Sequence, residues 1–256
     1  MAMKTKALLL AYLAVSMVSC SMRSEDKILK ALMLTGNDHP AHKWEETSPV
    51  IKEIMESDST IVVTITRNPE RLAALDKETF DFLILNYCNW EDPEGLSEAA
   101  KNGLIRYLDQ GGGLMVLHFA NGAFHFSLPK AESSDWPEYR KIVHQVWDHT
   151  GESTHDDYGE FEVHIKDSDH YITGGISNFI TEDELYFNQV GEEDLEPLYT
   201  AVSKKSLKKE PLAWAYTYKN ARVFQSLLGH GAISYQPHEY REILMNAAFW
   251  VCREER

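Results

Sequence analysis

The sequence has 256 residues, of which 43% are hydrophobic, and a formal net charge of −15. This acidity argues against a nucleic-acid-binding protein, because binding to phosphates needs clustered lysine and arginine. Three cysteines are too few for a disulfide framework, so residues 28–256 are expected to form one domain stabilised by its own hydrophobic core.

The beginning of the chain has the pattern of a secretory signal. Two lysines precede an apolar run at 7–18, which is shorter than the roughly 20 residues of a membrane-spanning helix. The pair Ser19-Cys20 then resembles the cleavage site of a bacterial lipoprotein. We therefore predict a signal peptide at 1–19 and a polar tether at 20–27, with Cys20 as the lipidation site. Cleavage would remove the two lysines and make the net charge more negative by two.

The lipoprotein prediction places the protein in the bacterial cell envelope, facing the periplasm or the cell surface. It would then contact a membrane only through its lipid anchor. The alternative is an ordinary cleaved signal peptide in which Cys20 is incidental.

The first half of the domain alternates between strand-like and helix-like segments. Strands are predicted at 28–35, 60–66, 80–87 and 114–117, and helical segments from Trp44 to about 55, at 72–75 and at 96–110. This rhythm predicts a parallel sheet with helices on both sides. The glycines at 111–113 follow a helix and precede a strand, so they suit a helix cap and turn rather than a phosphate-binding loop.

After Asn121 this rhythm changes. We predict a loop at 124–135, a helix at 136–147, a polar excursion at 148–158, strands at 161–165, 184–190, 198–202, 212–218 and 222–228, and a closing helix at 237–252. The late strands are expected to extend the same sheet, and the excursion to cover its edge.

Two histidines directly follow buried strands. His118 comes after 114–117 and His230 after the apolar run that ends at 228, which places both at the carboxyl edge of the sheet, where α/β folds bind ligands. Imidazoles at one edge either transfer protons near neutral pH or hold a divalent metal such as zinc. No short metal-binding spacing such as H-E-x-x-H occurs, so a metal site depends on His118 and His230 meeting in space. The alternative is that each histidine only hydrogen-bonds a backbone group.

Acidic and aromatic residues add to this pattern. On a predicted strand, Glu184 and Tyr186 share one face, so that one can orient an imidazole while the other contacts a substrate. Trp44 follows the loop after the first predicted strand and Trp90 lies in the loop after the third, so both are expected at the same sheet edge. Flat indole rings suit the C–H faces of a sugar. Each of these residues is equally explained by an acidic turn or by packing. Cys88 leaves the third strand and is a weaker candidate, as a nucleophile.

The order and spacing of several short motifs resemble the ThuA-like (trehalose-utilisation) family over 28–250. The motifs are GGGL at 111–114, LH at 117–118, STH at 153–155, FEV at 161–163, DHYIT at 169–173, DELY at 183–186, RVF at 222–224 and LGH at 228–230. Tyr171 stands where the family usually has proline, and Asn220-Ala221 replaces a Gly-Lys-Gly-type turn.

This resemblance implies an α/β, flavodoxin-like fold of the class I glutamine-amidotransferase type, with three layers and a mainly parallel central sheet. It also implies a role in the use of disaccharides or their keto-derivatives. Amidotransferases carry a nucleophilic cysteine in the turn where His118 stands here, so amidotransferase activity is not expected.

We therefore predict a lipoprotein that acts on a sugar as an isomerase, lyase or hydrolase. Proton transfer beside a carbonyl is favoured, because it needs no nucleophile. The predicted catalytic residues are His118, His230, His155 and Glu184. The predicted substrate contacts are Trp44, Trp90, Tyr186 and His42, the last of which is expected near the entrance of the site. The alternatives are a sugar-binding lipoprotein without catalysis and a module that docks a protein partner. The sequence is also compatible with a homo-oligomer.

Overall fold

The computed structural model describes residues 27–37, 39–130, 133–191 and 195–254. The predicted signal peptide and the lipidation site Cys20 lie outside the described residues. Within them, no helix is both long and apolar enough to cross a bilayer.

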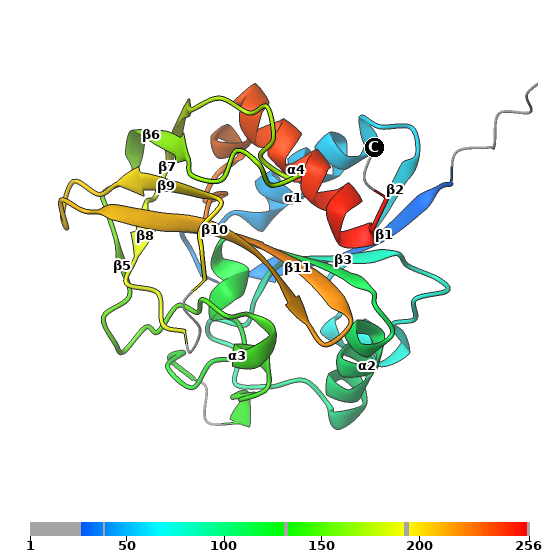
Figure 1. Cartoon of the computed structure of the whole chain (residues 1–256). Helices are drawn as coiled ribbons and strands as arrows, with labels where there is room; N and C mark the ends of the chain where they lie inside the picture. Colours follow the sequence, from blue (N-terminus) through cyan, green and yellow to red (C-terminus); the bar gives the residue numbers. More distant parts are fainter. Residues whose placement is uncertain (1–26, 38, 131–132, 192–194, 255–256) are drawn as a thin grey trace, which may run out of the picture.

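A nine-stranded sheet forms the centre of the molecule (Figure 1). Its strands are β1 (Leu29–Asn37), β2 (Ile61–Thr66), β3 (Phe82–Cys88), β4 (Gly113–Leu117), β6 (Gly159–Ile165), β7 (Phe179–Asp183), β9 (Tyr199–Val202), β10 (Lys209–Tyr218) and β11 (Ala221–Ser226). Their order in the sheet is β2-β1-β3-β4-β11-β10-β9-β6-β7. Neighbours from β2 to β11 are parallel, and those from β11 to β7 are antiparallel.

Helices cover both faces of this sheet. They are α1 (Trp44–Glu56), α2 (Glu98–Asp109), α3 (Tyr139–Ile142) and α4 (His238–Cys252), together with the 3-10 turns η1 (Pro69–Ala74), η2 (His118–Gly122) and η4 (Ala232–Tyr235). Figure 1 shows α1 and α4 on one face and α2 and α3 on the other. The predicted three-layer α/β fold with a mainly parallel centre is thus confirmed.

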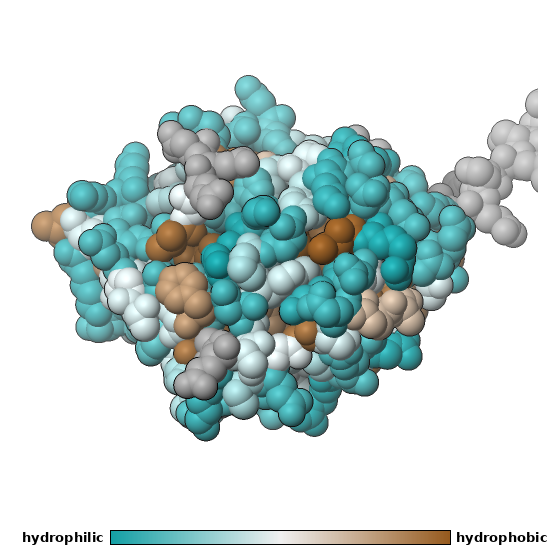
Figure 2. Space-filling view, turned by 90° about the horizontal axis from the view of Figure 1, so that it is seen from below, coloured by the Kyte–Doolittle hydropathy of each residue, from teal (hydrophilic) through white to brown (hydrophobic). Residues whose placement is uncertain are grey.

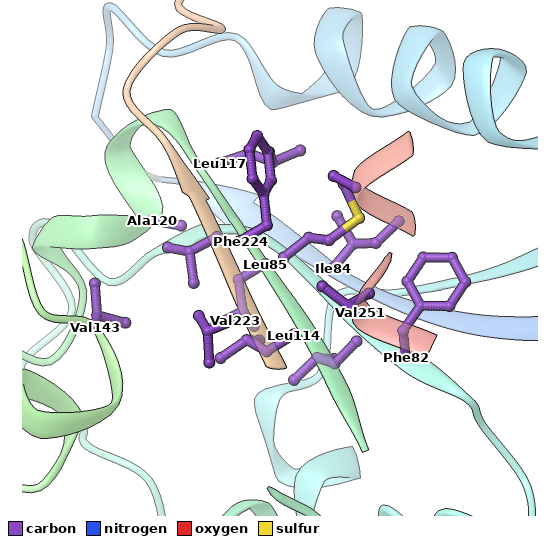
Figure 3. Close-up of a cluster of buried hydrophobic side chains, with 14 of the residues drawn as sticks. Phe82, Ile84, Leu85, Leu114, Leu117, Ala120, Val143, Val223, Phe224 and Val251 are labelled. Carbon is purple, nitrogen blue, oxygen red and sulfur yellow. The ribbon is translucent and has the colours of Figure 1, made fainter. Parts of the chain in front are cut away.

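The core lies around the central parallel strands. Every residue of β4 from Leu114 to Leu117 is fully buried, because both faces of the strand are covered. Figure 3 shows side chains of β3, β4 and β11 packing together with Val251 of α4. On the other face α2 lies against η1, where a Cβ atom added to Gly103 would be 2.0 Å from the carbonyl oxygen of Leu72.

The predicted helix at 136–147 is wrong, because only the single turn of α3 forms there. The residues that follow α3 form backbone hydrogen bonds with segments far away in the sequence. The amide of His144 donates to the Tyr216 hydroxyl at 3.1 Å, and Val146 exchanges backbone hydrogen bonds with Val190. These tertiary hydrogen bonds take the place of the ones a helix would make within itself.

The predicted strand at 184–190 is also wrong. The main strand here is β7, which ends at Asp183, and only β8 (Tyr186–Phe187) is extended beyond it. The short β8 pairs with β5 (Thr154–His155) in a separate two-stranded sheet. A continuous strand is excluded because Asn188 has a φ of 55°, in the left-handed region.

Candidate functional site

Three histidines meet at the carboxyl edge of the parallel strands. His42 lies between β1 and α1, His118 follows β4, and His230 follows β11. Their ring centroids are 5.0 Å apart for His42–His118, 4.9 Å for His42–His230 and 5.3 Å for His118–His230. We call these three residues the histidine cluster. The structure thus brings together the two histidines on which the sequence hypothesis depended, and it adds a third.

A chain of hydrogen bonds fixes the proton positions in the cluster. The Leu227 carbonyl can only accept, so His118 Nδ1–H donates to it at 2.8 Å. Nε2 of His118 then accepts from the Tyr186 hydroxyl at 3.2 Å, and the same hydroxyl oxygen accepts from His42 Nε2–H at 3.1 Å. His42 Nδ1 is therefore left unprotonated. It is buried and has no hydrogen-bond partner among the described residues.

Burial controls the charge of two of these imidazoles, those of His42 and His118. It lowers the pKa of His42 far below the usual value, and the nearby rings of His118 and His230 lower it further. Burial, followed by the proximity of His230, lowers the pKa of His118 to about 3, although the contact with the Leu227 carbonyl acts in the opposite direction. His42 and His118 are consequently neutral at physiological pH. In this form an imidazole can accept a proton or coordinate a metal.

A carboxylate lies beside the cluster. Glu184 Oε2 is 3.1 Å from His230 Nδ1, and its Oε1 is 3.7 Å from His155 Nδ1. Burial by itself would raise the pKa of Glu184, but the contact with His230 and the nearby His155 hold it below the ordinary value. Glu184 lies in the connection from β7 to β8 rather than on one strand with Tyr186, as was predicted, but both side chains line the same cavity.

The buried Asp183 ties two parts of the site together. Its Oδ1 accepts the backbone N–H groups of Glu184 at 2.8 Å and His230 at 3.1 Å, and its Oδ2 accepts that of Gly229 at 2.7 Å. Burial raises the pKa of Asp183 to about 6, while the three N–H groups favour the charged form. The sequence marked Asp183 only as part of an acidic turn, and its bracing role was missed.

An aromatic cavity of 210 Å³ opens beside the cluster. Trp90, Phe119, Trp147 and Tyr186 form its apolar walls, and His155 and Glu184 supply polar groups. The predicted placement of Trp90, His155 and Tyr186 near the cluster agrees with this geometry. Phe119 and Trp147 were missed: Phe119 directly follows His118, but Trp147 was hidden in the segment predicted to be helical.

Two of the predicted substrate contacts have different surroundings from those expected. His42 was predicted near the entrance, but it is only 9% exposed, because its ring stacks on Phe119 with centroids 4.3 Å apart. Trp44 lines a second, more open cavity of 370 Å³ and packs under the guanidinium of Arg67, 4.5 Å away. A third, small pocket of 10 Å³ is lined by Trp44 and by all three histidines of the cluster. It shares Trp44 with the cavity of 370 Å³ and His42 with the aromatic cavity.

Comparisons with known proteins agree on the fold. A family model described as ThuA, trehalose utilisation, matches residues 30–251. A ThuA-like protein from Parabacteroides merdae is 24% identical, with 88% of this chain and 90% of that chain covered and a TM-score of 0.72. One from Bacteroides uniformis is 19% identical, with 90% and 94% covered and a TM-score of 0.68.

A larger protein contains a similar fold. A β-galactosidase from Rahnella sp. R3 is 12% identical, with 90% of this chain but only 32% of that chain covered and a TM-score of 0.58. At such identities, the structural likeness concerns the fold alone. No curated protein matches the chain.

Proposed function

Because this chain belongs to the ThuA, or trehalose-utilisation, family, we propose that it acts on a carbohydrate at the histidine cluster. The proposed substrate is a keto-sugar or a keto-derivative of a disaccharide, and the proposed reaction is proton transfer beside its carbonyl group. The observation that carries this proposal is the meeting of three imidazoles and the Glu184 carboxylate beside an aromatic cavity, whose wall includes His42 and Glu184.

The cavity supports a sugar as the ligand. Its volume of 210 Å³ is below the roughly 300–1,000 Å³ of pockets for drug-sized molecules, so it suits a small ligand such as one sugar ring. The rings of Trp90, Phe119 and Trp147 offer apolar faces to the C–H groups of a pyranose. His155 and Glu184 offer hydrogen bonds to its hydroxyl groups. For a disaccharide, we propose that Trp44, which lines the separate cavity of 370 Å³, contacts the second ring.

The proposed chemistry needs a base and a group that stabilises negative charge. A base removes the proton from the carbon beside the carbonyl, and the electron pair of that C–H bond moves toward the carbonyl oxygen. In an isomerisation, that oxygen takes up a proton, a proton returns to the former carbonyl carbon, and the hydroxyl group on the first carbon loses its proton to become the new carbonyl. In an elimination, the leaving group instead departs with the electron pair of its own bond and takes up a proton. His118 and His230 serve either as the acid/base pair or as metal ligands, and His155 and Glu184 assist.

A lipid anchor at Cys20 is part of the same proposal. It rests on the sequence pattern at residues 7–20 and places the enzyme in the cell envelope, where it would meet sugars before their uptake.

The test follows 3-keto-disaccharides by NMR in deuterated water. The wild-type protein is expected to form product and to incorporate solvent deuterium beside the carbonyl. His118→Ala should lower turnover by about 10²- to 10⁴-fold, as expected for the loss of an acid/base group. His238→Ala, an exposed histidine at the start of α4, is the matched control and should retain full activity.

Each result decides between the hypotheses. Equal turnover by wild type and His118→Ala would remove His118 from the mechanism. Sugar binding by calorimetry without any product would favour the non-catalytic sugar-binding lipoprotein. Absence of both binding and product would contradict a role in carbohydrate recognition and leave the partner-docking alternative.

A further inference from the structure

Four side chains near the aromatic cavity have the geometry of a metal site. One nitrogen from each imidazole of the histidine cluster and one oxygen of Glu184 all lie within 4.8 Å of one another. In a tetrahedral site with bonds of about 2.1 Å, ligand atoms are about 3.4 Å apart, so modest rotations of these side chains would close the site. We infer that His42, His118, His230 and Glu184 bind one divalent transition-metal ion.

The donor atoms define which ions would bind. Three imidazole nitrogens and one carboxylate oxygen suit Zn²⁺ and its neighbours in the first transition row, whereas Mg²⁺ and Ca²⁺ prefer oxygen ligands. Because uncharged imidazole ligands and one carboxylate supply a single negative charge, they leave half of the charge of a divalent cation unneutralised. A site of this kind can still stabilise a developing negative charge on a bound oxygen atom.

The surroundings of the ligands support the same inference. The hydrogen bond from His118 Nδ1–H to the Leu227 carbonyl fixes the ring orientation, as such outer bonds do in metal sites. Asp183 holds the backbone of both His230 and Glu184. Nδ1 of His42, which has no hydrogen-bond partner in the described part of the chain, is a buried nitrogen with an unused lone pair.

There is also room for an ion. The 10 Å³ pocket against the three imidazoles has space for about one water-sized body, which is too small for a sugar. The aromatic cavity of 210 Å³ adjoins this small pocket, because His42 and Phe119 line both of them. An ion in the small pocket and a sugar in the cavity would therefore be neighbours.

The role of the ion, unlike its binding, rests on the proposed function. An ion held here would stabilise the negative charge that develops on the sugar's carbonyl oxygen. With His118 and His230 engaged as ligands, the role of the base falls in this proposal to His155, which lines the aromatic cavity beside Glu184. Its side chain is 39% exposed, and its Nδ1 lies 3.7 Å from Glu184.

The test measures metal binding directly. Chelator-stripped full-length protein is dialysed against Zn²⁺ or Co²⁺, followed by elemental analysis and, for Co²⁺, visible absorption. We expect about one ion per chain and the absorption of a four- or five-coordinate Co²⁺ site, with no comparable binding of Mg²⁺. His42→Ala, His118→Ala, His230→Ala and Glu184→Gln should each weaken binding by at least about tenfold.

Three variants serve as controls. His155→Ala and Tyr186→Phe alter the cavity without removing a proposed ligand and should keep the ion, as should the distant His238→Ala. Circular dichroism shows whether each variant is folded. Should the ligand variants misfold, calorimetry of the wild-type protein with Zn²⁺ alone decides. Failure of the wild type to retain Zn²⁺ or Co²⁺, or unchanged retention by folded ligand variants, would overturn the inference.

The two proposals fail separately. A wild-type protein that converts keto-sugars but retains neither Zn²⁺ nor Co²⁺ would contradict the metal site and leave the proposed function standing. A protein that binds one Zn²⁺ through these ligands but neither binds nor converts sugars would contradict the proposed function and leave the metal site standing.

Discussion

Asp183 shows how one buried side chain can determine the geometry of a whole site. Its two oxygens accept three backbone N–H groups, including those of His230 and Glu184. In Asp183→Asn, one oxygen becomes an NH₂ group that faces an N–H donor. Leaving such a buried donor unsatisfied costs about 1–3 kcal/mol. We expect urea denaturation to show a loss of stability in this range, together with reduced turnover.

The control for this prediction is Asp157→Asn, which removes a fully exposed carboxylate paired with Lys205. This variant should unfold at nearly the same urea concentration as the wild type. If Asp183→Asn were as stable as Asp157→Asn, the proposed bracing role of Asp183 would be incorrect.

Single residues of the site were predictable to different degrees. His118 and His230 could be placed because each directly follows a buried parallel strand, and strand ends define one edge of a sheet. The depth of His42 was missed, because the direction of a loop side chain depends on contacts such as its stacking on Phe119. Trp44 was placed at the correct edge but borders a neighbouring cavity, since sequence spacing does not separate adjacent pockets.

At the scale of helices and strands, the spacing of apolar residues predicted the positions of the main covering helices well. The helices expected at 96–110 and 237–252 are Glu98–Asp109 and His238–Cys252 in the structure. The predictions failed where a segment directs its hydrogen bonds to distant parts of the chain, as at 136–147. They also began the strand β10 at residue 212, whereas it begins at Lys209. Pro211 lies within β10 at a shift of register between β9 and β10, where a strand tolerates proline.

The contact of α2 with η1 gives a prediction about packing. A methyl group at Gly103 would collide with the backbone of Leu72 and Ala73. Gly103→Ala should therefore destabilise the protein by about 1–3 kcal/mol or more, even though alanine favours a helix, because η1 must move away. Thermal and urea denaturation would measure this loss. Gly159→Ala in β6 is the control, since nothing lies within 4 Å of the added atom, and it should leave stability nearly unchanged.

At the scale of the whole molecule, Figure 2 shows a mostly hydrophilic face with small, separate hydrophobic patches. Patches of this size are normal for a single soluble chain and do not mark an interface on this face. Self-association into a homo-oligomer therefore stays a prediction.

Attachment to the cell envelope gives a prediction at the same scale. Expressed in a bacterium with its own leader, the wild-type protein should incorporate labelled palmitate and partition with the membrane fraction. Cys20→Ser should lose the label and leave that fraction, because no lipid can be attached. Ser24→Ala, four residues further along, is the control and should remain attached. Equal partitioning of Cys20→Ser and wild type would contradict the lipid anchor.

The four proposed metal ligands come from four segments of the chain, and the last of them, His230, follows the final strand β11. A growing or partly folded polypeptide thus has no complete ligand set, and an ion can be captured only once the finished domain has closed around it. If the chain is exported unfolded through the proposed signal peptide, ion loading would happen outside the cytosol. The ions present there, rather than those where the chain is translated, would then decide which metal the protein carries.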